Sequence, residues 1–279
     1  MEVPLLETAV LAARAGGEVL LRHFGSGDLE VRLKAQNDYV TRADRESEAA
    51  IAELIRARHP GDHVLGEEGG AHAGGRGERQ WLIDPLDGTT NFLHGLPVFA
   101  VSVACREAGE LVAGVVLDPL ADNLFTAAHG AGAHWNGRPM RVSARAGLQA
   151  AFLATGYPFR AQAALGVYLD IFREIFQHTG AIRRCGSAAL DLAYTAAGIY
   201  DGFFEFRLSP WDLAAGVLLI QEAGGVVSDL DGGNRFLASG NLLAGGPQVW
   251  PALRAAVARH ASEAKLQELV PVEGESLLC

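Results

Sequence analysis

Hydrophobic residues recur along the chain at two different spacings, and the pattern changes near residue 144. An apolar stripe from Leu5 to Leu20 has helical spacing and predicts an opening amphipathic helix of about five turns. A second helix is predicted from after Asp44 to Arg58, with Asp44 as its N-cap and a stop at His59-Pro60-Gly61. Short apolar runs between turn residues then predict strands at 64–65, 81–83, 99–105, 112–117 and 123–127.

Beyond residue 144, predicted strands and helices alternate. The strands are 151–154, 181–184, 202–206, 226–228 and 242–244, and the helices are 161–178, 187–197, 211–223 and 248–260. In the first half, Gly109-Glu110 between two apolar runs predicts a hairpin, so the sheet there is antiparallel or mixed. Two α/β halves, 1–145 and 146–265, are expected to stack in layers with a cleft at their junction. The weaker pattern of the tail, 266–279, predicts partial disorder.

Composition narrows the class of protein. The 279 residues are 49% hydrophobic and carry a net charge of −10, which is typical of a globular protein and argues against extended nucleic-acid binding. No apolar run is long enough for a membrane helix, and the N-terminus lacks the pattern of a signal peptide. Three widely separated cysteines fit neither a disulfide framework nor a metal motif. These features predict a cytoplasmic protein without membrane association.

The stretch from Trp81 to Phe92, WLIDPLDGTTNF, is the most informative for chemistry. An apolar strand ends in Asp84, and Pro85 is predicted to turn the chain so that Asp87 returns near Asp84. Two such carboxylates can share a hard cation, while Gly88, Thr89 and Thr90 offer N–H groups and hydroxyls to a phosphate. Taken alone, Asp-Gly also fits an ordinary turn.

Two further acidic positions have similar contexts. Glu67 follows a predicted strand in Gly66-Glu67-Glu68-Gly69, where a surface loop is the alternative. Asp212, in Trp211-Asp212, opens a predicted helix, where an N-cap is the alternative. If Glu67, Asp84, Asp87 and Asp212 meet in one cleft, they form an all-oxygen cage that selects Mg²⁺, or Mn²⁺ as a substitute, over zinc or copper.

Together these motifs resemble the inositol monophosphatase family. The resemblance runs from about Leu5 to His260 and rests on DYVTRAD at 38–44, GEE at 66–68, DPLDGTT at 84–90 and WD at 211–212. The segments 186–198 and 212–225 look like the bacterial branch of the family. The resemblance implies an αβαβα sandwich, as in fructose-1,6-bisphosphatase, a homodimer, and a lithium-sensitive phosphatase that needs two or three Mg²⁺ ions.

The resemblance also implies a role for each matching residue. Metals would be held by Glu67, Asp84, the Leu86 carbonyl, Asp87 and Asp212. Glu67 and Thr89 would activate the attacking water, with Asp44 orienting the Thr89 hydroxyl. Substrate would contact Asp87, Gly88, Thr89, Thr90, Ala188, Glu205 and Asp212. The expected reaction is hydrolysis of inositol 1-phosphate, or of a similar small polyol phosphate, by water with no phosphorylated protein intermediate.

Several alternatives stay open. The segment 155–159, TGYPF, lacks the serine with which animal relatives contact ring hydroxyls, so fructose 1,6-bisphosphate and histidinol phosphate are alternative substrates. A different class is a regulatory protein of the transcription antitermination machinery that associates with RNA polymerase and Nus factors, with Arg183 and Arg184 as a docking patch. For those arginines, a dimer contact or surface salt bridges are the competing interpretation. The glycine-rich stretch 69–77 is a candidate gate for metal entry.

Overall fold

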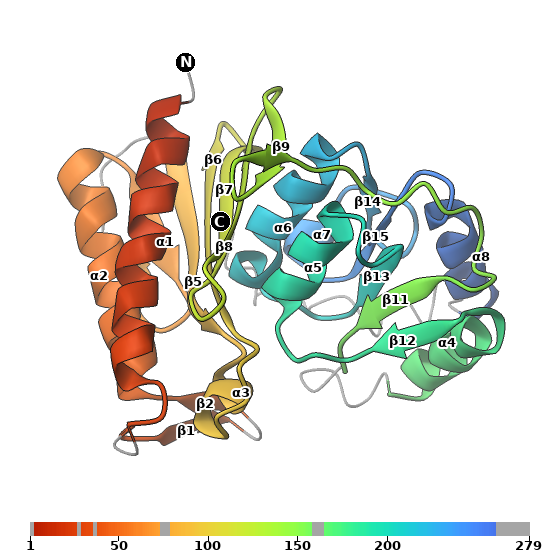
Figure 1. Cartoon of the computed structure of the whole chain (residues 1–279), viewed down its shortest axis with the longest axis horizontal. Helices are drawn as coiled ribbons and strands as arrows, with labels where there is room; N and C mark the ends of the chain where they lie inside the picture. Colours follow the sequence, from red (N-terminus) through yellow and green to blue (C-terminus); the bar gives the residue numbers. More distant parts are fainter. Residues whose placement is uncertain (1–2, 27–28, 36–37, 73–78, 158–164, 261–279) are drawn as a thin grey trace.

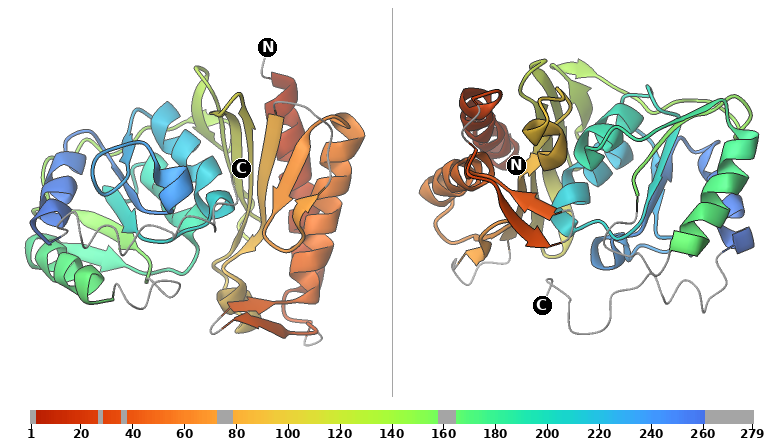
Figure 2. Two further views of the ribbon diagram at one scale, coloured as in Figure 1. Left: turned by 180° about the vertical axis from the view of Figure 1, so that it is seen from behind. Right: turned by 90° about the horizontal axis from the view of Figure 1, so that it is seen from below.

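Helices and sheets alternate in five layers (Figure 1). The structure is a computed structural model that describes residues 3–260 except 27–28, 36–37, 73–78 and 158–164. Helices α1 (Val3–His23) and α2 (Arg42–Arg58) cover the outer face of the first sheet, and α5 (Ala188–Ala196) and α6 (Pro210–Glu222) lie between the two sheets. Helices α4 (Leu165–His178) and α8 (Trp250–His260) cover the second sheet, and the view from behind shows the same order (Figure 2). The predicted αβαβα sandwich is confirmed.

The first sheet is mixed, as predicted. Its strand order is β10-β9-β8-β7-β6-β5-β3-β4, and only the β3–β5 pair is parallel among the strands that the structure describes. Its long strands are β5 (Arg79–Asp87), β6 (Ala100–Glu107) and β7 (Glu110–Asp118). The shorter ones are β3 (His63–Gly66), β4 (Gly70–His72), β8 (Asn123–Ala128), β9 (Gly132–Trp135) and β10 (Arg138–Pro139).

The second sheet combines the predicted strands of the C-terminal half. Its order is β12-β11-β13-β15-β14, with parallel pairing around β11 and antiparallel pairing around β15. The strands are β11 (Phe152–Thr155), β12 (Ala181–Arg183), β13 (Gly202–Glu205), β14 (Val226–Ser228) and β15 (Leu242–Gly245). The pattern did not predict β1 (Arg32–Ala35), β2 (Asp38–Val40), α3 (Thr89–Leu93), α7 (Phe236–Ser239), β9, or the edge strands β4 and β10.

Helix α6 shows why the layers stay together. Every residue from Pro210 to Ile220 is buried, so the helix has no polar face. Such a helix is stable only inside a core, and here it packs between the two sheets. Its polar end carries Glu222, whose carboxylate accepts hydrogen bonds from the backbone N–H groups of Gly130 and Gly132 at 2.8 Å each.

Two local predictions were wrong. Helix α2 begins at Arg42 with Thr41 as its N-cap, and Asp44 is the third helical residue of a capping box with Thr41. Pro85 does not turn the chain, because β5 continues to Asp87. The pairing of β5 with β6 instead shifts register between Asp84 and Asp87. The sequence therefore located the right residues but assigned them the wrong local geometry.

The other predictions concern the cysteines, membrane-spanning helices and three segments of the chain. Cys105 and Cys185 are free thiols. Within the described ranges, no helix is both long and apolar enough to cross a bilayer. The tail 266–279, residues 73–77 of the glycine-rich stretch and residues 161–164 of the predicted helix lie outside the described residues.

Candidate functional site

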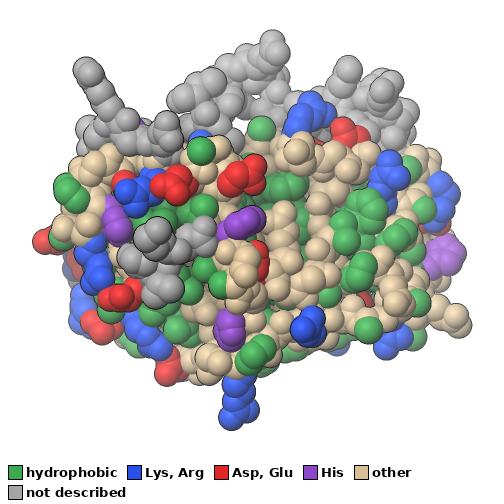
Figure 3. Space-filling model, turned by 90° about the horizontal axis from the view of Figure 1, so that it is seen from above, with side chains coloured by type: hydrophobic (Ala, Val, Ile, Leu, Met, Phe, Trp, Pro, Cys, Tyr) green, Lys and Arg blue, Asp and Glu red, His purple; other side chains and the backbone are tan. Residues whose placement is uncertain are grey.

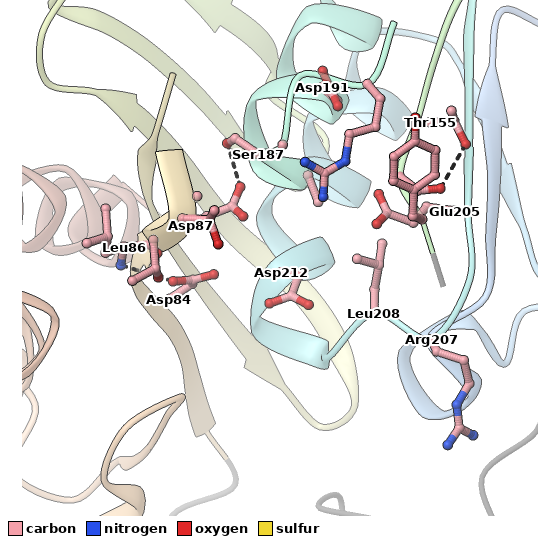
Figure 4. A pocket seen from close by; sticks show the side chains of 18 of the residues that line it. Asp84, Leu86, Asp87, Thr155, Ser187, Asp191, Glu205, Arg207, Leu208 and Asp212 are labelled. Atoms are coloured by element: carbon pink, nitrogen blue, oxygen red, sulfur yellow. Dashed lines mark hydrogen bonds between the residues drawn. The ribbon is translucent and has the colours of Figure 1, made fainter. Parts of the chain in front are cut away.

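The end of β5 meets the first turns of α3, α5 and α6 around a cavity of about 650 Å³. Ten of the eleven residues predicted for the site line this cavity: Glu67, Asp84, Leu86, Asp87, Gly88, Thr89, Thr90, Ala188, Glu205 and Asp212. The eleventh, Asp44, lies behind the wall in contact with Thr89. Figure 4 shows Asp84 and Asp87 on one side of the cavity, Glu205 on the other and Asp212 between them.

The register shift in β5 explains how Asp84 and Asp87 reach the same cavity. In a regular strand, residues three apart point to opposite faces. The extra residue of a bulge changes this alternation, and both carboxylates line the cavity. Asp84 is 1% exposed, and its Oδ1 accepts a hydrogen bond from the Leu86 N–H at 3.0 Å. The bulge thus does what the sequence analysis expected of a proline turn.

Asp87 connects the two halves of the molecule. Its Oδ2 accepts a hydrogen bond from the Ser187 hydroxyl at 2.6 Å and another from the Ala189 N–H at 2.7 Å, both at the start of α5. Ser187 is also the N-cap of that helix. Burial raises the pKa of Asp87 to about 6, and the nearby Asp212 carboxylate adds to the rise.

The other carboxylates around Asp84 repel its charge. Burial raises the pKa of Asp84 well above its usual range, and Glu67, Asp87 and Asp212 raise it further. Asp212 is the third residue of α6, where its Oδ2 accepts a hydrogen bond from the Ser209 N–H at 2.7 Å. The N-cap of α6 is Ser209 and not Asp212. Asp212 still helps to cap the helix, as the third helical residue of a capping box with Ser209.

A buried chain of hydrogen bonds holds the Thr89 hydroxyl. Thr89 Oγ1 lies 3.2 Å from Asp44 Oδ1 and 3.1 Å from the Leu86 carbonyl, two acceptors for its one proton. The other oxygen of Asp44 accepts from the Thr41 N–H at 2.9 Å. Gly88, just before Thr89, has φ of +96°, and a side chain there would be 2.9 Å from the Val98 carbonyl. This tight turn fixes where Thr89 begins α3.

Sequence reasoning missed Glu48. It lies on α2, is only 3% exposed, and accepts hydrogen bonds from the N–H groups of Glu68 at 2.8 Å and Gly69 at 2.7 Å. A side chain at Gly66 would overlap the Glu48 carboxylate. Glu48 therefore anchors the backbone directly after Glu67. Its position one helical turn after Asp44, on the buried face of the helix, was the available signal.

A second group of polar residues, which the sequence pattern did not predict as part of the site, lies on the Glu205 side of the cavity. Tyr157, Arg184 and Asp191 line it together with Glu205. Burial raises the pKa of Glu205 well above its usual range, and the carboxylates of Asp191, Asp212 and Asp87 add to the rise. Arg184 was predicted only as part of a docking patch, but it lies in the cavity wall.

The residues present fit divalent cations of the Mg²⁺ type. Glu67, Asp84, Asp87 and Asp212 supply only hard oxygen donors, and the neighbouring carboxylate charges raise the pKa values of Asp84 and Asp87 beyond the effect of burial. As they stand, no three His, Cys, Asp or Glu side chains of the described ranges converge closely enough to hold an ion.

Fold and site together define a layered α/β protein with a carboxylate-lined cavity between its two sheets, the arrangement expected of a cation-dependent phosphatase. The sequence model of the inositol monophosphatase family matches residues 1–266. The chain belongs to this family.

Individual relatives carry two kinds of name. The chain is 49% identical over 262 residues to the Nus factor SuhB of Pseudomonas aeruginosa, covering 92% of this chain and 97% of the relative. It is 48% identical over 260 residues to the inositol-1-monophosphatase of Mesorhizobium japonicum, again covering 92% and 97%. The crystal structure of the extragenic suppressor protein suhB from Bartonella henselae has a TM-score of 0.89 at 43% identity, over 92% of this chain and 99% of that one. The structure of inositol monophosphatase from Anabaena has a TM-score of 0.82 at 37% identity, over 92% and 96%.

Proposed function

We propose that the protein is a Mg²⁺-dependent phosphomonoesterase that hydrolyses inositol 1-phosphate or a similar small polyol phosphate. The observation that carries the proposal is the cavity in which Glu67, Asp84, Asp87 and Asp212 meet beside the Thr89 hydroxyl. Family membership and the name of the Mesorhizobium relative support the phosphatase reaction.

In this proposal, residues on one side of the cavity bind cations and residues on the other side contact the leaving alcohol. Glu67, Asp84, the Leu86 carbonyl, Asp87 and Asp212 would hold the cations. When bound, divalent cations would neutralise the phosphate, activate water and stabilise charge on the leaving oxygen.

Near the cations, Asp44 accepts a hydrogen bond from Thr89 and so aims that hydroxyl. Thr89 and Glu67 would then orient the attacking water, while the N–H groups of Gly88 and Thr89 hold the phosphate oxygens. Glu205 and the backbone of Ala188 would contact the hydroxyls of the alcohol that leaves. No side chain of the protein has to become phosphorylated.

Phosphate release from a panel of substrates tests this proposal. The panel contains inositol 1-phosphate, fructose 1,6-bisphosphate, histidinol phosphate and 3′-phosphoadenosine 5′-phosphate, each with Mg²⁺, with EDTA, and with Mg²⁺ plus Li⁺. We expect Mg²⁺-dependent, Li⁺-inhibited release that is fastest with inositol 1-phosphate. Turnover undiminished by EDTA would refute the cation requirement, and a preference for another substrate would select that alternative.

A second candidate function rests on the relatives named Nus factor SuhB. It is an association with RNA polymerase and Nus factors, compatible with phosphatase activity. Charge does not favour direct nucleic-acid contact: on the face in Figure 3, acidic side chains stand among the basic ones that are drawn there. A pull-down with RNA polymerase and Nus factors tests the association, and no enrichment over an unrelated acidic protein would reject it.

The residue to substitute for that pull-down is Arg183 and not Arg184. Arg184 lines the cavity, so its replacement would disturb both functions. The Arg183 guanidinium lies 5.0 Å from the centre of the Phe152 ring, outside the residues that line the cavity. Arg183→Ala therefore separates docking from catalysis.

A homodimer is the remaining family expectation, and α4 offers a surface for it. Leu165, Leu169 and Phe176 are 47%, 46% and 62% exposed. With the partly buried Phe172 they follow a four-three-four spacing, the seam by which two helices pack. A two-fold axis would place the same stripe against itself.

A further inference from the structure

Two adjacent arginines, Arg183 at the end of β12 and Arg184 in the loop that leads to α5, point to different places. Arg184 lines the cavity, with its guanidinium carbon 5.2 Å from the centre of the Tyr157 ring, within the range of a cation–π contact. The Arg183 guanidinium lies over Phe152 instead and donates to the Ile182 carbonyl at 3.2 Å. Of the two arginines, only Arg184 is therefore presented to a molecule that enters the cavity.

A buried carboxylate stands behind Arg184. Asp191, on α5, is 2% exposed, and its Oδ1 has no hydrogen-bond partner. An unpaired buried carboxylate is costly unless a positive charge lies close to it. Burial raises the pKa of Asp191 well above its usual range, and the Arg184 guanidinium counteracts that rise, as it does for Glu205. The Arg184 guanidinium is therefore a positive charge that acts on both acids, and the Cys185 side chain also hydrogen-bonds Asp191.

The backbone around this group leaves room for its charged side chains. Gly186 has φ of +91°, and a side chain there would come within 2.9 Å of Arg184 Nη1 and of Asn91 Nδ2. Asn91 Nδ2 donates to the Cys185 carbonyl at 2.9 Å and so anchors the same loop to α3. A side chain at Gly156 would overlap the Glu205 carboxylate. Glycines at both positions keep the guanidinium and the carboxylate in the wall.

We propose that Arg184 is a specificity-determining residue that recognises the hydroxyls of the leaving alcohol, and that Asp191 is the positioning residue that holds its guanidinium in place. This inference rests on the proposed phosphatase function. A hydroxyl can accept a hydrogen bond from the guanidinium and donate one to Glu205. A second phosphate on the substrate would instead lie beside two acids, with one guanidinium to offset its charge. The site therefore favours monophosphates of polyols over bisphosphates such as fructose 1,6-bisphosphate.

Steady-state kinetics of Arg184→Gln test the inference with two substrates. Inositol 1-phosphate has a leaving group rich in hydroxyls, and p-nitrophenyl phosphate has none. Loss of one hydrogen bond to a charged donor corresponds to a rise in KM of about tenfold or more for inositol 1-phosphate. We expect less than about a twofold change for p-nitrophenyl phosphate. Arg183→Gln is the matched control and should change neither KM.

Asp191→Asn tests the positioning role without removing volume from α5. Alone, it should raise the KM for inositol 1-phosphate. In an Arg184→Gln background it should have no further effect, because both substitutions remove the same interaction with the substrate. Equal rises in KM for the two substrates, additive effects of the two substitutions, or efficient hydrolysis of fructose 1,6-bisphosphate by the wild type would overturn the inference. A folded wild type that cleaves neither substrate would refute the proposed function instead.

Discussion

Replacing Glu48 with Gln changes a residue that touches neither substrate nor cation in our scheme, yet it should alter the cation requirement. The two carboxylate oxygens of Glu48 accept from the N–H groups of Glu68 and Gly69 at 2.8 and 2.7 Å. A glutamine keeps one acceptor oxygen and turns an NH₂ group toward the other N–H. One charged hydrogen bond is therefore lost, and two donors face each other in a buried place.

The size of the expected effect on the Mg²⁺ requirement follows from the loss of this one hydrogen bond. A hydrogen bond to a charged group contributes about 1.5–3 kcal/mol, and about 1.4 kcal/mol corresponds to a factor of ten in an equilibrium. The loss loosens the segment that presents Glu67, and cation binding must restore its order. We therefore expect the Mg²⁺ concentration for half-maximal activity to rise about 10–100-fold, the range found for residues that support metal ligands.

Phosphate release measured against Mg²⁺ concentration provides the assay. Activity of Glu48→Gln at saturating Mg²⁺ should return to within about twofold of wild type, because the bound cation restores the position of Glu67. Glu53→Gln is the matched control, since Glu53 is exposed on the same helix. An unchanged Mg²⁺ requirement, or a loss of activity that Mg²⁺ does not rescue in a variant with normal Tm, would refute the reasoning.

Three further substitutions and one change of pH have clear expected outcomes. Asp87→Asn should remove most turnover while the circular dichroism spectrum stays native, and near-normal kcat at saturating Mg²⁺ would contradict the assignment. Because the pKa of Asp87 is raised to about 6, the folded state binds its proton more tightly than the unfolded state does. Stability is therefore lost as pH rises from about 4 through 6, so the Tm measured in EDTA should fall over that window, and less steeply in Asp87→Asn. Gly156→Ala should displace Glu205 and raise the KM for inositol 1-phosphate, with little change for p-nitrophenyl phosphate. Phe176→Glu should give monomers by light scattering, whereas an unchanged oligomer would exclude the α4 stripe as the interface.

The alternation of strands and helices in two stacked halves was predictable from hydrophobic spacing, whereas the αβαβα order came from the family resemblance. The continuous apolar runs of β6, β7 and α6 belong to elements that are almost fully buried in the structure. Short edge strands such as β4 and β10 were missed, because two or three residues carry no measurable period. The N-cap at Asp44 was wrong for a related reason. Thr41 and Asp44 are both good capping residues, and only the hydrogen bonds of the folded helix distinguish them.

The sequence by itself determined the family and the oxygen-donor chemistry, because DPLDGTT, GEE and WD place carboxylates at the ends of predictable elements. Only the tertiary structure decided which other side chains surround them. Glu48 and Ser187 act across contacts between residues far apart in the chain, and no local pattern encodes such contacts. The same is true of Arg184. Its sequence context is shared with Arg183, and it is the packing of the loop against Tyr157 that turns one arginine into the cavity and leaves the other outside.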